Sequence, residues 1–394
     1  MTAFPKIRHI IRNTVISPIQ EFIKDSRAVG ITLLACTVLS LVLANSPWSA
    51  DYLELIEKEI HIAGAWQLPH TFLHWINDGL MAVFFFLVGM EIKRELLIGE
   101  LSSIKKASLP IAAAIGGMLV PALIYLFFNK DTPYQSGWGV PMATDIAFSL
   151  GVASLLGSRI PVSLKIFLMA LAIIDDLGAI LVIAIFYGGA INWIYLLIGA
   201  GIVLVMLALT KYKMQPWWVT LIGGLLLWYC VFNSGIHATI AGVVVAFLVP
   251  LDRLNHYEHS LHDIVNFIIL PLFALANTAI VIPGNLVESL TSSLSWGVLA
   301  GLVLGKPLGI TFFSWATIKL GWGDQPSGTT ISQIIGIGAL AGIGFTMSIF
   351  ITMLAFSDAD HQNISKLAIL IGAVISILGG LTILHLTSRR VNVE

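Results

Sequence analysis

Long apolar segments alternate with short polar ones from residue 28 to the end of the chain. A helix needs about 20 mostly apolar residues to cross the roughly 30 Å of hydrocarbon in a bilayer. The pattern predicts twelve such spans, at residues 28–46, 72–92, 108–128, 139–157, 163–187, 191–210, 217–233, 236–250, 262–282, 295–318, 332–356 and 366–387. We therefore expect an all-α polytopic membrane protein whose residues 1–394 form a single transmembrane domain.

Composition narrows the class further. Of the 394 residues 57% are hydrophobic and 11% are charged, whereas a soluble domain carries about 25% charged residues. This balance excludes a soluble enzyme, a nucleic-acid binder and a disordered protein, and the unbroken apolar segments exclude a porin-type barrel with a polar lumen. The net charge of −1 points to no charged macromolecular partner, and both cysteines lie in apolar segments, so no disulfide framework is expected.

The basic residues predict the orientation of the spans. With residues 1–27 taken as a cytoplasmic N-terminal segment, seventeen Lys and Arg residues fall inside, three fall outside and one lies within a span, which accounts for all 21. Cytoplasmic loops of membrane proteins are enriched in Lys and Arg. The distribution therefore supports twelve spans with both termini in the cytoplasm.

The outside loop at residues 47–71 has a pattern of its own. Around residues 57–68, alternating residues precede Ala63-Gly64, where a turn is possible, and Ala65-Trp66-Gln67-Leu68 follows. This pattern suggests a short hairpin, and an irregular loop is the alternative. Because an isolated hairpin is marginally stable in water, a partner chain that pairs with its edge is plausible.

The strongest chemical signal is a pair of aspartates in the middle of the segment 163–187. A carboxylate at bilayer depth costs a few kcal/mol by insertion scales, so Asp175 and Asp176 are taken as functional. Two neighbouring carboxylates in a low-dielectric medium hold protons tightly and titrate as a coupled pair. The pair predicts a site that exchanges a proton for a small hard cation such as sodium or lithium. The alternative is that both aspartates only hydrogen-bond neighbouring helices.

Two spans carry signals of an interrupted helix. Glycines and Pro141 precede Thr144 and Asp145 in span four, and the segment GIGALAGIGFTMS, which includes Ser348, is rich in glycine in span eleven. Two interrupted spans in comparable halves are typical of transporters built from inverted repeats. We expect Asp145 to neutralise the positive helix ends and Lys306 the negative ones, with Thr144 and Ser348 as neutral oxygen donors. A plain interhelical ion pair is the alternative for both charged residues, and Pro307 predicts a kink beside the lysine.

Further ionisable residues lie near the ends of spans. Asp78 is near the outer end of span two and is a possible accessory group. Glu91 and Glu95 share a helix face at its inner end, and Glu258, His259 and His262 follow a predicted loop at residues 252–257. These inner residues fit a pH-sensing mouth or a set of solvated charges, and composition alone favours solvated charges.

Together these motifs resemble the bacterial NhaA-type sodium/proton antiporter family. The resemblance runs over nearly the whole chain, through WINDGLMAVFFFLVGMEIKREL, PMATDIAFSLGV, ALAIIDDLGAI, SGIHATIAGV, EHSLH, ILPLFALAN, GKPLGI and LAGIGFTMSIFI. It implies twelve spans with two interrupted, crossing helices (spans four and eleven) and electrogenic exchange of Na+ or Li+ for H+ across the bacterial inner membrane, activated at alkaline pH. No cofactor and no metal beyond the transported ion are implied.

The resemblance also implies roles for individual residues. Asp175 and Asp176 match the ion and proton site, Asp145 and Lys306 match residues that compensate the broken helices, and the outside hairpin matches a dimerisation element. A set assigned to pH response matches Glu91, Arg94, Glu95, His237, Glu258, His259 and His262. Two other functions stay open from the residues themselves: a passive cation channel, and an intramembrane aspartyl protease that uses Asp145 with Asp175 or Asp176.

Overall fold

The computed structural model describes residues 27–60, 67–212 and 216–388, and its regular structure there is helical apart from one isolated β-bridge. The α-helices of the first half are α3 (Ala28–Ala44), α4 (Ser49–Glu57), α5 (Phe72–His74), α6 (Met81–Leu97), α7 (Ile104–Asn129), α8 (Ile146–Ser154) and α9 (Val162–Phe186). Those of the second half are α10 (Trp193–Lys211), α11 (Trp217–Phe232), α12 (Ile240–Leu248), α13 (Leu251–Ile264), α14 (Leu270–Asn277), α15 (Leu286–Thr291), α16 (Ser293–Ala300), α17 (Lys306–Lys319), α18 (Ile331–Ala341), α19 (Phe345–Ala355) and α20 (Ala359–Thr387).

Shorter helical turns of other types connect or continue these helices. Three are 3₁₀ turns, η3 (Glu100–Ser102), η4 (Gln135–Met142) and η5 (Gly157–Arg159), and three are π turns, η2 (Trp75–Leu80), η6 (Val265–Ile269) and η7 (Gly301–Gly305). The π turns η6 and η7 come just before Pro271 and Pro307. Proline cannot donate to the carbonyl four residues earlier, so the helix widens there and continues. The helical stretch 293–319 stays one candidate span through the π turn η7, and the kink expected beside Lys306 stays a prediction.

Every one of the twelve predicted apolar segments overlaps at least one helix. Among the described residues, seven helical stretches are long and apolar enough to cross a membrane, and two bent pairs raise the number of candidate spans to nine. The bent pairs are α3 with α4, at 116°, and α18 with α19, at 49°. The shorter helices α8, α11 and α12 occupy the remaining predicted segments.

The boundaries of one predicted span need correction. The span predicted at 262–282 runs from Leu251 to Asn277 through α13, η6 and α14, so the loop predicted at residues 252–257 is wrong. The segment after Pro250 contains neither glycine nor proline up to Ile264 and places polar residues along an exposed face. A search for apolar segments misses such a helix, because most of its residues are polar.

The predicted outside loop at residues 47–71 has regular structure at its start and a bridge at its end. Helix α4 fills its first part, and Glu59 forms an isolated antiparallel β-bridge with Thr71. The Ile60 amide donates to the His70 carbonyl at 2.7 Å, and the Phe72 amide donates to the Lys58 carbonyl at 3.1 Å. The tip of the predicted hairpin, residues 61–66, lies outside the described residues, so its form stays a prediction.

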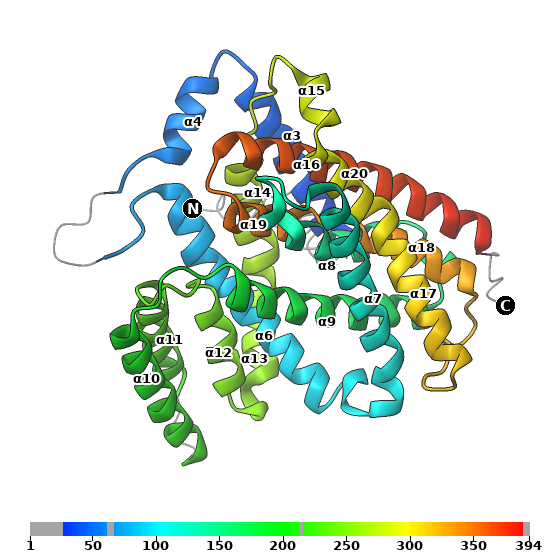
Figure 1. Ribbon diagram of the computed structural model, residues 1–394. Coiled ribbons are helices and arrows are strands. Elements are labelled where there is room, and N and C mark those ends of the chain that lie inside the picture. Colours follow the sequence, from blue (N-terminus) through cyan, green and yellow to red (C-terminus); the bar gives the residue numbers. More distant parts are fainter. Residues whose placement is uncertain (1–26, 61–66, 213–215, 389–394) are drawn as a thin grey trace, which may run out of the picture.

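Helix α9 runs through the middle of the molecule, whereas α10 and α11 stand at its edge (Figure 1). In α9, 61% of the apolar window is buried inside the protein, against 11% in α10. A helix that is apolar all round packs in an interior or against lipid. The two aspartates of α9 therefore lie in the protein interior, and the apolar side chains of α10 form an outer surface.

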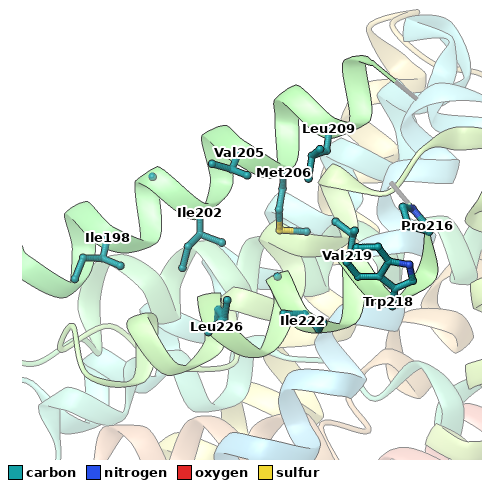
Figure 2. Close-up of a pocket in the computed structure, with 12 residues that line it drawn as sticks. Ile198, Ile202, Val205, Met206, Leu209, Pro216, Trp218, Val219, Ile222 and Leu226 are labelled. Atoms are coloured by element: carbon teal, nitrogen blue, oxygen red, sulfur yellow. The ribbon is translucent and has the colours of Figure 1, made fainter. Parts of the chain in front are cut away.

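An apolar groove of about 800 Å³ separates parts of α10 and α11 (Figure 2). Its lining includes Ile202, Met206, Trp218 and Ile222, and every residue that lines it is apolar. Such a groove offers no oxygen ligand to a small hard cation. An ion site is therefore expected among the buried polar residues elsewhere in the protein.

One close helix approach involves small residues on α7 and α17. A Cβ atom added to Gly309 would overlap the backbone carbonyl oxygen of Gly116, and a Cβ atom on Gly116 would overlap that of Gly309. Because α17 begins with Lys306, this contact fixes the depth at which the lysine enters the bundle. Small residues at a helix interface allow such an approach in membrane proteins.

We expect Gly309→Ala to destabilise the protein by about 1–3 kcal/mol, the usual cost of overpacking a close contact. Gly379→Ala is the matched control, because Gly379 lies inside α20 with nothing within 4 Å of an added Cβ atom. The stability of that control should stay unchanged or rise by about 0.5–1 kcal/mol, because alanine reduces the conformational entropy of the unfolded chain. Thermal unfolding in detergent measures both variants, and equal midpoints would contradict the assigned contact.

Candidate functional site

Lys306 is the centre of the buried polar site. Its side chain is fully buried, and its ammonium donates to Asp175 Oδ2 and to Thr144 Oγ1, each at 2.8 Å. The Thr144 hydroxyl in turn donates to the Ala341 carbonyl at 2.9 Å. The contacts therefore join α17, α9, the break before α8 and the C-terminal end of α18.

The two adjacent aspartates of α9 have different surroundings. Both are buried, with 1% and 2% of the residue surface exposed for Asp175 and Asp176. Asp175 is paired with Lys306, whereas Oδ1 of each aspartate lacks a hydrogen-bond partner among the described residues. A buried carboxylate oxygen without a donor is costly. These two oxygens are therefore the candidate positions for a bound proton or cation.

Asp145 caps two helices at once. Its Oδ1 accepts from the Phe148 amide of α8 at 2.9 Å, and its Oδ2 accepts from the Thr346 hydroxyl and amide of α19 at 2.5 and 3.2 Å. Both helices begin at a break, and helix N-termini carry unpaired amides and a partial positive charge. One carboxylate thus satisfies the N-terminal ends of both helices, in the place where the sequence predicts this compensation.

The opposite helix ends at these breaks are satisfied by neutral donors. The Ser149 hydroxyl donates to the Leu340 carbonyl at 3.0 Å, and the Asp145 amide donates to the Ile343 carbonyl at 2.7 Å. The Ser348 hydroxyl donates to the Val140 carbonyl of η4 at 2.8 Å. Lys306, expected near these negative ends, donates instead to the side chains of Asp175 and Thr144.

A second polar cluster lies where α6 ends. Arg94 forms an ion pair with Glu258 of α13 and lies 3.5 Å from Glu95, and both glutamates are buried. Glu95 also accepts from the Glu100 amide at 3.0 Å. These three predicted residues are therefore brought together. Glu91 is one helical turn from Glu95 on α6 and is partly buried.

The two histidines of α13 differ from this cluster. Both His259 and His262 are exposed, and the contacts of the His262 ring are with Asn266, at 3.1 Å, and Asp263, at 3.5 Å. Glu258 faces the protein, because it is buried on the same helix. The structure thus brings Arg94 to Glu258 and leaves the two histidines exposed on the outer face of α13.

Asp78 and His237 line a separate cavity of about 540 Å³. Asp78 lies 2.8 Å from His74 Nε2, and His237 Nε2 donates to the Tyr187 carbonyl at 2.6 Å. Asp78 is 17 residues before Glu95 on one helical stretch, so the two polar regions are about 25 Å apart along it. His237, predicted with the inner residues by resemblance, therefore lies at the opposite end of the bundle.

Several polar partners were not singled out from the sequence. Thr346, the partner of Asp145, stands in the glycine-rich segment but carries no distinguishing spacing. His74 precedes Asp78 by four residues. Because this spacing places two residues on one helix face, it could have predicted their contact. Asn77 and Asn277 bond to each other at 2.8 Å across 200 residues of sequence, and no local pattern reveals that pair.

Comparison with known proteins identifies the family. The family model described as Na+/H+ antiporter 1 matches residues 20–384. The chain belongs to this family. The chain is 48% identical over 379 residues to a Na(+)/H(+) antiporter NhaA of Cytophaga hutchinsonii, an alignment that covers 94% of this chain and 95% of the relative.

Other relatives are similar over comparable lengths. A Na(+)/H(+) antiporter NhaA 1 of Klebsiella pneumoniae is 48% identical over 378 residues, covering 93% of this chain and 96% of the relative. A Na(+)/H(+) antiporter NhaA of Escherichia coli is 46% identical over 382 residues, covering 94% and 98%. The resemblance seen in the sequence motifs is thereby confirmed, and a family of transporters favours exchange over a protease or a passive channel.

Proposed function

We propose that the protein is a secondary active antiporter that exchanges Na+ or Li+ for H+ across the bacterial inner membrane. The observation that carries the proposal is the buried pair Asp175 and Asp176, whose Oδ1 atoms have no donor among the described residues and which lie beside the buried ammonium of Lys306. Membership in a Na+/H+ antiporter family supports it. The carboxylates hold protons in one state and a cation in the other, and alternating access exposes them to each side in turn.

The site residues have separate roles in this proposal. Asp176 is the main cation ligand, and Asp175 alternates between the cation and its ion pair with Lys306. Thr144 holds the ammonium in place, and Asp145 compensates the N-terminal ends of α8 and α19. If the two carboxylates release protons to bind one cation, more positive charge moves one way than the other and the exchange is electrogenic. Asp78 is an accessory group on the cavity at the other end of span two.

We further propose a single domain of twelve spans in which the fourth and eleventh are interrupted and cross. The short α8 after η4 and the bent pair of α18 and α19 support the two interruptions. Contacts of Thr144, Asp145 and Ser149 with the end of α18 support a crossing at the breaks. The distribution of basic residues supports termini that both lie in the cytoplasm.

Asp176→Asn should abolish sodium-dependent collapse of a proton gradient in proteoliposomes, because an amide keeps the shape but cannot alternate between a proton and a cation. Asp51→Asn is the control and should retain exchange, since Asp51 is an exposed acid of α4 that belongs neither to the buried site nor to the cavity of Asp78. Unchanged exchange in Asp176→Asn would contradict the site assignment. Sodium flux without proton counterflux in the unsubstituted protein would instead support a passive channel.

We also propose that alkaline pH activates exchange through the cluster of Arg94, Glu95 and Glu258. The ion pair between Arg94 and Glu258 joins α6 to α13. A change in the protonation of Glu258 therefore changes the contact between these two helices. Glu91 and the exposed His259 and His262 lie on the same two helices, and they complete the group predicted to respond to pH. His237 joins this response from the separate cavity.

Glu258→Gln should move the pH of half-maximal exchange by roughly one unit, the shift produced by a change of about 1.4 kcal/mol in the interaction between ionisable groups. The matched control is Asp252→Asn, an exposed acid in the first turn of the same helix, which should leave the profile in place. Rates of exchange measured across the alkaline range test both. Equal profiles for the two variants would remove Glu258 from the pH response.

We propose finally that two copies associate through the outside segment at residues 57–68. The bridge between Glu59 and Thr71 supports paired backbone at the base of this segment, and an exposed strand edge is able to pair with a second chain.

Replacing residues 61–66 by a short glycine linker should convert the dimer into a monomer, because the edge available for pairing is removed. Native mass spectrometry in detergent measures the mass of the particle. The same kind of replacement at residues 326–328, in the loop before α18, is the control and should leave the dimer intact. A monomer before any replacement would contradict the proposal.

A further inference from the structure

Tyr187 connects the end of α9 to the segment that leads into the first helix break. Its hydroxyl accepts a hydrogen bond from the Gly139 amide at 3.1 Å and donates one to the Ser136 carbonyl at 2.8 Å. Both partners belong to η4, which ends at Met142, two residues before Thr144. Tyr187 itself is the residue that follows α9, eleven positions after Asp176. One side chain thus ties the helix of the aspartate pair to the segment of Thr144 and Asp145.

The contact is closely fitted on both sides. A Cβ atom added to Gly139 would come within 2.6 Å of the Tyr187 hydroxyl oxygen, so glycine is needed for this approach. The ring of Tyr187 stacks on Trp138 with their centroids 6.4 Å apart. A phenol titrates near pH 10, so the hydroxyl remains a donor in the physiological range.

The backbone of Tyr187 is held from the opposite direction. Its carbonyl accepts from His237 Nε2 at 2.6 Å, which requires the proton on that nitrogen because a carbonyl only accepts. The neighbouring Gly189 amide donates to the Gly235 carbonyl at 2.7 Å, and Gly235 has a positive φ of 86° that favours glycine. The end of α9 is therefore fixed to the wall of the cavity that His237 lines.

The other hydrogen bonds that join η4 to a neighbouring helix lead to α19, and Trp138 of η4 also packs against Phe186 of α9 with ring centroids 5.1 Å apart. The Ser136 hydroxyl donates to the Ala355 carbonyl at 2.9 Å, and the Ser348 hydroxyl donates to the Val140 carbonyl at 2.8 Å. These two bonds hold η4 against α19. The ion site, however, needs Thr144 after η4 and Asp175 on α9 to reach the same lysine, each at 2.8 Å.

We propose that Tyr187 is a positioning residue for transport, which sets η4 and α19 against α9 so that Thr144 and Asp175 meet at Lys306. This inference rests on the proposed sodium/proton exchange. Tyr187 touches neither the ion nor Lys306 in this scheme and acts only through the placement of Thr144. Loss of its hydroxyl therefore weakens cation binding more than it slows turnover.

Tyr187→Phe should raise the KM for Na+ about tenfold, since losing hydrogen bonds to two backbone groups costs about 1.4 kcal/mol. The maximal rate should stay within about twofold of that of the unsubstituted protein, the signature of weakened binding. The control is Tyr125→Phe, which removes a partly buried hydrogen bond of 2.7 Å to the carbonyl of Tyr134, the residue before η4. That bond leads to α7, so the control should lower the thermal midpoint but leave KM in place.

Gly139→Ala attacks the same contact from η4 and serves as a second variant if Tyr187→Phe folds poorly. It should also raise KM, and the double variant should raise KM no further than the larger single effect, because both act on one contact. Unchanged KM in both single variants, or an equal rise in Tyr125→Phe, would overturn the inference. An unsubstituted protein without exchange would overturn the proposed function itself, and this inference with it.

Discussion

The structure depends on one constraint: a fully buried ammonium must have partners in an apolar interior. Unpaired charges in a low-dielectric medium cost far more than the few kcal/mol that a folded protein can spare. Lys306 meets this requirement with one carboxylate and one hydroxyl, which come from α9 and from the break before α8. Its position therefore fixes three elements relative to one another, and the close approach of α7 and α17 fixes its depth.

This constraint separates the two aspartates, although they are adjacent in sequence. Consecutive residues of a helix point about 100° apart, so only one of them faces Lys306 directly. Asp175 is held by the ion pair, whereas no ion pair involves Asp176 among the described residues. A pair with one compensated member and one uncompensated member suits exchange, because a proton or a cation on the second member alters the balance of charge at the first.

Much of the fold follows from local patterns, and the exceptions have physical causes. The apolar segments predicted a helix in each of twelve places, and Asp145, expected to compensate helix ends, accepts hydrogen bonds at the start of α8 and of α19. The start of α13 was missed because its residues are polar. Helix α4 was missed because its residues lie in the segment that was predicted to be an outside loop. Thr346 and Tyr187 escaped notice because a threonine or tyrosine gains its role from a partner about 50 to 200 residues away, which no local spacing records.

The capping of the breaks limits which groups are available for chemistry. Asp145 accepts from α8 through one oxygen and from α19 through the other, so both of its oxygens are committed to helix ends. The carbonyl ends are bound by hydroxyls and an amide, which are neutral and keep one charge state. The buried groups at this site whose charge is free to change are then Asp175, Asp176 and Lys306. In the proposed exchange, a cation that enters displaces protons from these groups, because the other polar groups at the breaks hold helix ends through their hydrogen bonds.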